Sequence, residues 1–157
     1  MNIRSAVPED HLALLDIWLG SVQKTHQFLT ETDIQTLLPT VRDYLALPNL
    51  DLWVLCTDDG RAIGFMSLAE SSIEALFIAP DWLRCGGGRA LLAHARAVPG
   101  RPLRVDVNKQ NSEAVQFYRA SGFSVVGRSS TDGQGRPFPL LHLSEDGQVE
   151  AVPDAPD

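Results

Sequence analysis

Three consecutive glycines, Gly86 to Gly88, lie between Arg84 and a run of helix-forming residues that starts at Arg89. Glycines leave their backbone amides uncovered, and the first amides of a helix have no acceptor within that helix. A glycine turn that leads into a helix therefore offers N–H groups and the positive end of the helix dipole to phosphate oxygens. The pattern predicts an anion site, although glycine runs also occur in plain loops that need positive φ angles.

Two known phosphate-binding patterns fit this loop poorly. Gly86, Gly88 and Asp106 match part of the dinucleotide-binding fingerprint, but Leu91 occupies its third glycine position and a predicted strand hairpin precedes the loop. A P-loop requires Gly-Lys-Ser or Gly-Lys-Thr, which the chain lacks. Neither pattern explains the loop, so it must be interpreted in the context of the elements around it.

That context is an alternation of strand and helix patterns. Hydrophobic periodicity and turn residues predict strands over residues 2–7, 52–56, 62–68, 73–78, 103–107, 123–126 and 140–143. Helices are expected to begin near residues 8, 32, 88 and 112, and the last should end at Gly122. The order is strand, two helices, three strands, helix, strand, helix, two strands. It predicts an α/β domain with a mixed sheet, hairpins in its first half and crossover helices in its second.

The composition limits what this domain does. A chain of 157 residues with 44% hydrophobic content suits one domain, expected over residues 1–144, and the acidic segment 145–157 is expected to be disordered. The formal charge of −7 is concentrated in that segment, so no basic face for nucleic acid is expected. No apolar run is long enough to span a membrane and no cleavable leader is apparent, which predicts a soluble cytoplasmic protein. Cys56 and Cys85 form no disulfide or metal-ligand pattern, so we expect no metal.

Three segments together resemble the GCN5-related N-acetyltransferase (GNAT) superfamily: residues 76–80, the glycine loop, and residues 111–123. The superfamily has a loop of the type Gln/Arg-x-x-Gly-x-Gly/Ala, followed by Asn-x-x-Ala-x-x-Phe-Tyr-x-x-x-Gly-Phe. The second motif matches at every fixed position, and the specific part of the resemblance covers residues 73–123. Within the superfamily the chain looks most like small bacterial acetyltransferases with a tryptophan in the first helix and a Pro-x-Pro-Leu-Leu final strand, here residues 137–141.

The resemblance implies a GNAT fold: a mixed, mostly antiparallel sheet of about six or seven strands with splayed central strands, flanked by about four helices. It also implies acetyl-CoA as cosubstrate, with its pyrophosphate on the loop amides and its pantetheine along the fourth strand, as an added strand would lie. The residues expected at the cofactor are Leu76, Phe77, Ile78, Arg84, Cys85, Gly86, Gly87, Gly88, Arg89, Asn108, Asn111, Ala114 and Phe117. One departure is Leu83, at the position where the motif has arginine or glutamine.

An amine would attack the thioester directly, and the resemblance implies roles for three residues. Tyr118 is the expected general acid for the leaving CoA thiolate, or else a core residue beside Phe117. Glu74 is the candidate general base, or else a carboxylate on a solvent face. Asn108 would hydrogen-bond the pantetheine or a water, or else serve as a turn residue, and Asn111 would cap its helix and also touch the cofactor.

Trp18, His26 and Phe28 lie where the superfamily builds its acceptor wall, so they are candidates for the substrate pocket; ordinary core packing or a surface position is the alternative. The acceptor itself stays open between a small-molecule amine and a peptide amine. A catalytically degenerate module that binds acetyl-CoA as a sensor or partner is the rival function, favoured by Leu83 and opposed by Tyr118. The resemblance is also compatible with a homodimer.

Overall fold

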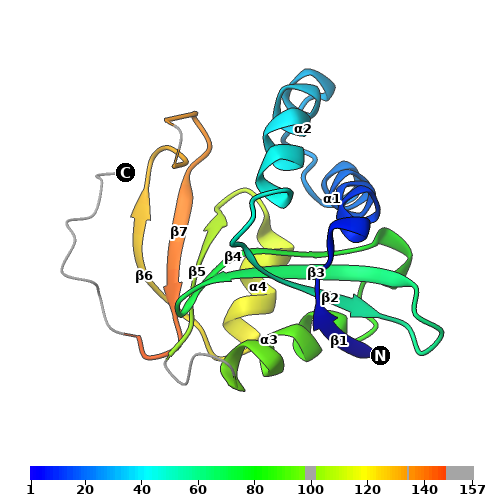
Figure 1. The fold of residues 1–157 in the computed structure, drawn as a ribbon. Coiled ribbons are helices and arrows are strands. Elements are labelled where there is room, and N and C mark those ends of the chain that lie inside the picture. The colour runs from blue at the N-terminus through cyan, green and yellow to red at the C-terminus, as the bar shows by residue number, and fades with distance from the viewer. Residues whose placement is uncertain (98–101, 134, 148–157) are drawn as a thin grey trace.

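A seven-stranded sheet forms the framework of the protein in the computed structural model, which describes residues 1–97, 102–133 and 135–147 (Figure 1). The strands lie in the order β1-β2-β3-β4-β5-β7-β6, and all neighbours are antiparallel except β4 and β5. Their bounds are β1 (Asn2–Ser5), β2 (Asp51–Cys56), β3 (Ala62–Ala69), β4 (Ser72–Ile78), β5 (Arg104–Asn108), β6 (Ser124–Ser129) and β7 (Leu140–Ser144).

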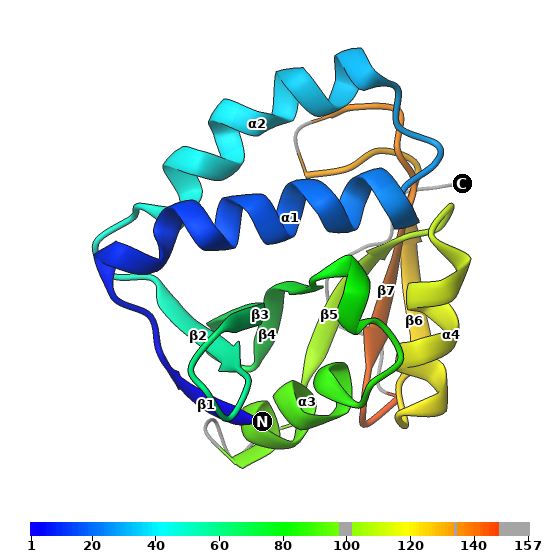
Figure 2. The ribbon, with the colours of Figure 1, turned by 90° about the vertical axis from the view of Figure 1, so that its right-hand side faces the viewer.

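The helices cover the two faces of the sheet in pairs (Figures 1 and 2). One pair is α1 (His11–Thr25) and α2 (Glu31–Leu45), and the other is α3 (Gly87–Ala97) and α4 (Ser112–Ala120). Short 3₁₀ turns, η1 (Pro8–Asp10) and η2 (Pro80–Trp82), precede α1 and α3. Side chains define two helix starts, because Thr30 and Asp33 form a capping box before α2 and Asn111 caps α4.

Each helix pair buries its own core against the sheet. Leu91 and Leu92 of α3 pack with Val105 and Val107 of β5 on one face, where Tyr118 of α4 is also buried. On the opposite face Leu14 and Trp18 of α1 pack with Phe65 of β3, together with apolar residues of α2. Strand β3 is covered on both faces and is apolar almost throughout, whereas in β5 the buried Val105 and Val107 alternate with the exposed Arg104 and Asp106.

The sheet splits between β4 and β5. Ser67 of β3 lies opposite Ala75 and Leu68 opposite Ile73, so Glu74 is an extra residue on β4 and forms a β-bulge. Pairing between β4 and β5 involves only Ser72 with Arg104 and Ile73 with Val105, and it ends where the bulge begins. Beyond this point β4 stays paired with β3, and β5 with β7, so the edge of β4 that faces β5 is left without a strand.

The predicted fold is confirmed, including the mixed sheet, the splayed central strands and the four helices. Boundaries differ by a few residues. The first strand ends at Ser5 instead of residue 7, because Asp10 turns back to accept hydrogen bonds from Arg4 and from the amide of Val7. The sixth strand extends to Ser129 instead of residue 126, because it pairs with β7 along that length.

The folded body extends beyond residue 144. The Glu145 carboxylate accepts hydrogen bonds from Arg96 Nε at 2.6 Å and from the Leu103 amide at 2.9 Å, and the Glu145 amide donates to the Leu103 carbonyl. This residue was expected in the disordered segment, but its contacts join the end of β7 to α3. Residues 148–157 of that segment lie outside the described residues. In the described part of the chain, no helix has the length and apolar character needed to cross a membrane.

Candidate active site

A cleft of about 790 Å³ lies between β4, the glycine loop and α4. Its size is in the range of small-molecule sites. It is bordered by residues from α1, β4, the loop and α4: Ser21, Thr25, His26, Leu76, Phe77, Ile78, Trp82, Leu83, Arg84, Gly86, Gly87, Gly88, Arg89, Asn111, Glu113, Ala114, Gln116, Phe117 and Tyr118. Because β4 borders the cleft and its edge facing β5 is unpaired, an extended ligand can hydrogen-bond there as an added strand would.

The glycine loop exposes a row of backbone amides. Arg84 has φ of 61° and Gly86 has φ of 90°, so the chain turns twice through the left-handed region before α3 begins. The first helical bond of α3 runs from the Ala90 amide to the Gly86 carbonyl. Among the described residues, no acceptor bonds the amides of residues 84–89. These amides, at the positive end of α3, are free to donate to an anion.

The other two glycines are required by packing. A Cβ atom on Gly87 would lie 2.7 Å from Leu55 Cδ2, and one on Gly88 would lie 2.8 Å from Phe117 Cζ. Both distances are shorter than real Cβ contacts allow, so a side chain at either position would force the Leu55 or Phe117 side chain to move. The three glycines therefore have separate roles: Gly86 for the turn, Gly87 for the sheet and Gly88 for α4.

Tyr118 borders the cleft from the second turn of α4 and is 6% exposed. Its ring makes edge contacts with Phe117 at 5.1 Å and with Phe123 at 5.3 Å between centroids. Burial raises the pKa of the phenol well above its ordinary value of about 10, so the hydroxyl stays protonated at neutral pH. No described residue hydrogen-bonds this hydroxyl, which leaves its proton available to a group in the cleft.

A chain of hydrogen bonds joins the end of α1 to the start of α4 across one end of the cleft, where the two helices meet in Figure 2. Thr25 Oγ1 donates to the Ser21 carbonyl at 2.8 Å, so it accepts from His26 Nδ1 at 2.8 Å. Asn111 Oδ1 accepts from the Ala114 amide, so Asn111 Nδ2 donates to His26 Nε2 at 3.3 Å. These directions assign the neutral Nδ1–H tautomer to His26, and burial lowers its pKa to about 4.

Aromatic rings continue from His26 toward the far side of the sheet. The His26 ring lies 6.4 Å from Phe77 and 5.3 Å from Phe28, and Phe28 lies 6.1 Å from Phe138. Phe77 belongs to the core on the α1/α2 face, whereas Phe138 comes from the connection between β6 and β7. The rings of Phe28 and Phe138 thus extend an aromatic cluster outward from His26 and Phe77, the two rings of this cluster that border the cleft.

Two carboxylates lie on the same face of the sheet, on either side of the split. Glu74 in the β4 bulge is exposed, and its charge raises the pKa of Tyr44 on α2, in addition to the larger effect of burial. Asp106 on β5 alternates with the buried Val105 and Val107, so it points away from α3 and α4. Glu74 and Asp106 are the next residues after the last β4–β5 pair.

Asp106 is held by a network that spans three strands. Asp106 Oδ1 accepts from His142 Nδ1 at 2.6 Å, and His142 Nε2 lies 2.7 Å from Ser129 Oγ. Because a carboxylate only accepts, Nδ1 carries a proton in either charge state of the imidazole. The network therefore orients Asp106 at the split while its side chain remains 59% exposed.

Most of the residues predicted for the cofactor border the cleft, but Cys85 and Asn108 do not. Cys85 is exposed, with its sulfur 3.5 Å from the Leu83 carbonyl. Asn108 is a turn residue, because its side-chain oxygen accepts from the Gln110 amide at 2.9 Å. Leu83, the departure from the motif, borders the cleft and packs on the core below α3, which accounts for an apolar side chain there.

The predicted substrate wall is brought together only in part. His26 borders the cleft. Phe28 contacts the His26 ring but does not border the cleft, and Trp18 is 5% exposed in the α1/α2 core, away from the cleft. Sequence reasoning missed the Asp106 network, because strand pairing is needed to bring Ser129 and His142 beside Asp106. It also missed Phe138, which only the fold brings beside Phe28. Within residues 1–97, 102–133 and 135–147, no three His, Cys, Asp or Glu side chains are grouped so as to hold a metal ion.

Comparison with known proteins gives consistent matches. The family model described as "Acetyltransferase (GNAT) domain" matches residues 30–138. The peptidyl-lysine N-acetyltransferase YjaB of Salmonella typhimurium is 43% identical over 144 residues, which are 91% of this chain and 97% of that protein. The solution structure of apo-form YjaB from Escherichia coli has 41% identity and a TM-score of 0.85, covering 94% of this chain and 98% of that one.

A more distant structure shares the fold. The PaiA N-acetyltransferase of Thermoplasma acidophilum, solved in complex with coenzyme A, has 22% identity and a TM-score of 0.74. The match covers 90% of this chain and 96% of that one. At this identity the likeness shows a common architecture.

The packing of Gly88 predicts a binding defect. In Gly88→Ala the new methyl group must displace the Phe117 ring, which borders the cleft. We expect the KM for acetyl-CoA to rise about tenfold, because displacement of one element by a fraction of an ångström misplaces the loop amides. Steady-state kinetics would measure it. Gly133→Ala is the control, since no atom lies within 4 Å of its added Cβ. Equal KM values for acetyl-CoA in both variants would contradict the role of Gly88 in positioning the loop.

The buried neutral His26 predicts a pH-dependent stability. Its pKa is about 4 in the folded protein and about 6.5 for a histidine exposed in the unfolded chain, so between these values the unfolded chain binds more protons. The free energy of unfolding therefore falls as pH drops from 6.5 to 4, by up to about 3 kcal/mol from this residue. Urea denaturation across this range should show a smaller pH dependence for His26→Gln than for the wild type. Identical slopes would show that the imidazole is not buried neutral.

Proposed function

Because this chain belongs to the GNAT acetyltransferase family and is an N-acetyltransferase, we propose that it transfers the acetyl group of acetyl-CoA directly to the side-chain amine of lysine in a peptide or protein. The observation that carries this proposal is the split in the sheet. Free amides and Tyr118 lie at the split on the α3/α4 face of the sheet, and the carboxylates Glu74 and Asp106 flank the split on the opposite face. The names of the YjaB relatives favour peptidyl lysine over a small amine.

Acetyl-CoA fits the cleft on three observations. The unbonded amides of residues 84–89 suit its pyrophosphate, and the open edge of β4 suits the amide groups of its pantetheine arm. Gly86 and Gly88 keep side chains away from the loop backbone, so the phosphates can approach it closely. Arg84 adds a positive charge, held loosely by Glu113 at 3.4 Å in an exposed ion pair.

Tyr118 is the proposed general acid. When the amine attacks the thioester carbonyl, the carbon–sulfur bond breaks and the CoA thiolate takes the phenol proton. A thiol in water has a pKa of about 8.5, far below the raised pKa of Tyr118. Proton transfer from Tyr118 to a thiolate in water would therefore be unfavourable. The same burial raises the pKa of a thiolate formed in the cleft, which reduces the difference. The transfer therefore depends on both groups being shielded from water.

Glu74 and Asp106 are proposed to receive the acceptor. A lysine ammonium must lose a proton before its nitrogen can attack, and a carboxylate beside the split can accept that proton directly or through a water. Two carboxylates on one face also attract a cationic acceptor over a neutral one. The aromatic cluster of His26, Phe28 and Phe138 is suited to the methylene stem of lysine, and the neutral His26 adds no repulsive charge.

The experiment that tests this function follows free thiol released from acetyl-CoA over a panel of amines. The panel contains a lysine peptide with a blocked N-terminus, the same peptide with norleucine for lysine, a peptide with a free N-terminus, spermidine and free lysine. Turnover should be fastest with the blocked lysine peptide, and mass spectrometry should place the acetyl group on its Nε atom. Turnover with only the small amines would overturn the peptide assignment, and binding without turnover across the panel would support the sensor alternative.

The role of Tyr118 predicts a defect in chemistry without a defect in binding. Tyr118→Phe should lower kcat by roughly 10²–10⁴, the range for loss of a general acid, while the KM for acetyl-CoA stays near that of the wild type. Thermal denaturation of Tyr118→Phe beside the wild type is the control for folding, because Tyr44, the other tyrosine of the chain, lies near Glu74. Steady-state kinetics would decide the role, and an unchanged kcat in Tyr118→Phe would exclude it.

The two carboxylates are distinguished by separate variants, Glu74→Gln and Asp106→Asn. Loss of the base should lower kcat by about 10² or more, whereas loss of a carboxylate that only attracts the ammonium should raise the KM for the lysine peptide by about tenfold. The kinetics with a lysine peptide at low ionic strength would measure both effects. If neither variant changes either constant, the acceptor does not approach from this face.

A further inference from the structure

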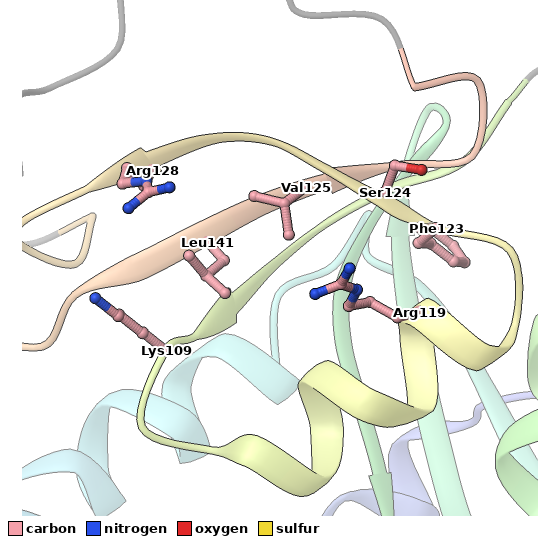
Figure 3. A pocket seen from close by; sticks show the side chains of 7 residues that line it. All are labelled: Lys109, Arg119, Phe123, Ser124, Val125, Arg128 and Leu141. Carbon is pink, nitrogen blue, oxygen red and sulfur yellow. The ribbon is translucent and has the colours of Figure 1, made fainter.

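A second pocket, separate from the cleft, lies between α4 and the strands β6 and β7 (Figure 3). Its volume is about 490 Å³, within the range of roughly 300–1,000 Å³ typical of small-molecule sites. Helix α4 separates it from the cleft. Arg119 is about 200° around this helix from Phe117, which borders the cleft, so the two side chains leave the helix on opposite sides.

The pocket combines an apolar floor with a basic rim. Val125 and Leu141, both partly buried, point from β6 and β7 toward α4, and Phe123 is buried beside them (Figure 3). The remaining residues that border the pocket are Lys109, Arg119, Arg128 and Ser124. Three of its seven residues are therefore cationic and none is a carboxylate, although the chain as a whole carries a formal charge of −7.

Two of these cations lack the partners that other basic residues have. Arg4 is paired with Asp10 at 2.8 Å and Arg96 with Glu145 at 2.6 Å. Within the described residues, neither the Lys109 ammonium nor the Arg119 guanidinium has a hydrogen bond or ion pair, and these two residues bond only through their backbones, whereas Arg128 has an interaction of its own. Like charges around one concave surface repel each other, and their field is concentrated there. An anion in the pocket would relieve this repulsion.

We propose that this pocket binds a small organic anion, with a carboxylate or phosphate group on a short apolar body. The guanidinium of Arg119 suits the anionic group because its planar fork binds carboxylate or phosphate oxygens in pairs, and Lys109 adds a point charge from the opposite rim. Val125 and Leu141 would contact the apolar body. The combination favours an amphipathic anion over a bare inorganic ion, which could not use the floor, and over a neutral molecule, which could not use the rim.

The test uses phenyl phosphate as the probe and the methyl NMR signals of Val125 and Leu141 as the readout, on the full chain with and without saturating acetyl-CoA. The expected result is a saturable shift of these signals in both conditions. Lys109→Gln with Arg119→Gln should weaken the affinity at least about tenfold, because two charge-assisted contacts are lost. The control, Arg42→Gln with Arg61→Gln, removes the same charge from exposed sites elsewhere and should change the affinity less than about twofold.

Comparison probes identify what the pocket recognises. Phenol should cause no shift of the two methyl signals, and inorganic phosphate should bind at least about tenfold more weakly than phenyl phosphate because it cannot contact the floor. Equal affinity for inorganic phosphate would mean an adventitious ion only, and equal affinity for phenol would mean an unspecific apolar surface. Tighter binding of an Asp/Glu-rich hexapeptide would replace the small anion by an acidic peptide. Shifts confined to the cleft residues would overturn the proposal without affecting the acetyltransferase assignment.

Discussion

The extra residue at Glu74 is the constraint on which the rest of the structure depends. A β-bulge bends its strand and interrupts its ladder. Here it ends the only parallel pairing in the sheet after two residue pairs, so β4 and β5 diverge. The divergence leaves an unpaired strand edge in the middle of a sheet instead of at its border. In most proteins such an edge is covered, because unpaired amides and carbonyls bind other strands. In this protein the edge borders the cleft, where a cosubstrate with amide groups can take the place of a strand.

Helix α4 connects the parts of the molecule that use this opening. One side of it carries Ala114, Phe117 and Tyr118 to the cleft, and its capping residue Asn111 also bonds His26 at the end of α1. Asn111 therefore caps α4 and also holds His26, the first residue of the α1–α2 connection. The opposite side of α4 carries Arg119 to the second pocket. The nine-residue helix α4 therefore contacts the cleft, the end of α1 and the second pocket, and links the three.

Charge is distributed to match the two sides of the split. The cofactor side has the positive end of α3, the unbonded amides and Arg84, all suited to phosphate. The acceptor side has the exposed carboxylates Glu74 and Asp106 and a histidine that burial keeps neutral. This charge distribution supports the proposal that an anionic cosubstrate and a cationic acceptor approach the split from opposite faces of the sheet. This separation favours a ternary complex in which the amine meets the thioester between them.

The sequence by itself determined the element order, the glycine loop and the motif from Asn111 to Phe123, because turns, caps and hydrophobic periodicity are local properties of the chain. These were enough to predict the fold and most residues of the cleft. Tertiary structure decided what depends on register between distant segments. Asp106, His142 and Ser129 come together only through pairing of β5, β7 and β6. For Trp18 the sequence leaves open a place at the substrate pocket or in the core, and the packing of α1 decides for the core. Long-range pairing leaves little trace in local sequence, because one pattern of alternation fits several registers until the whole sheet selects one.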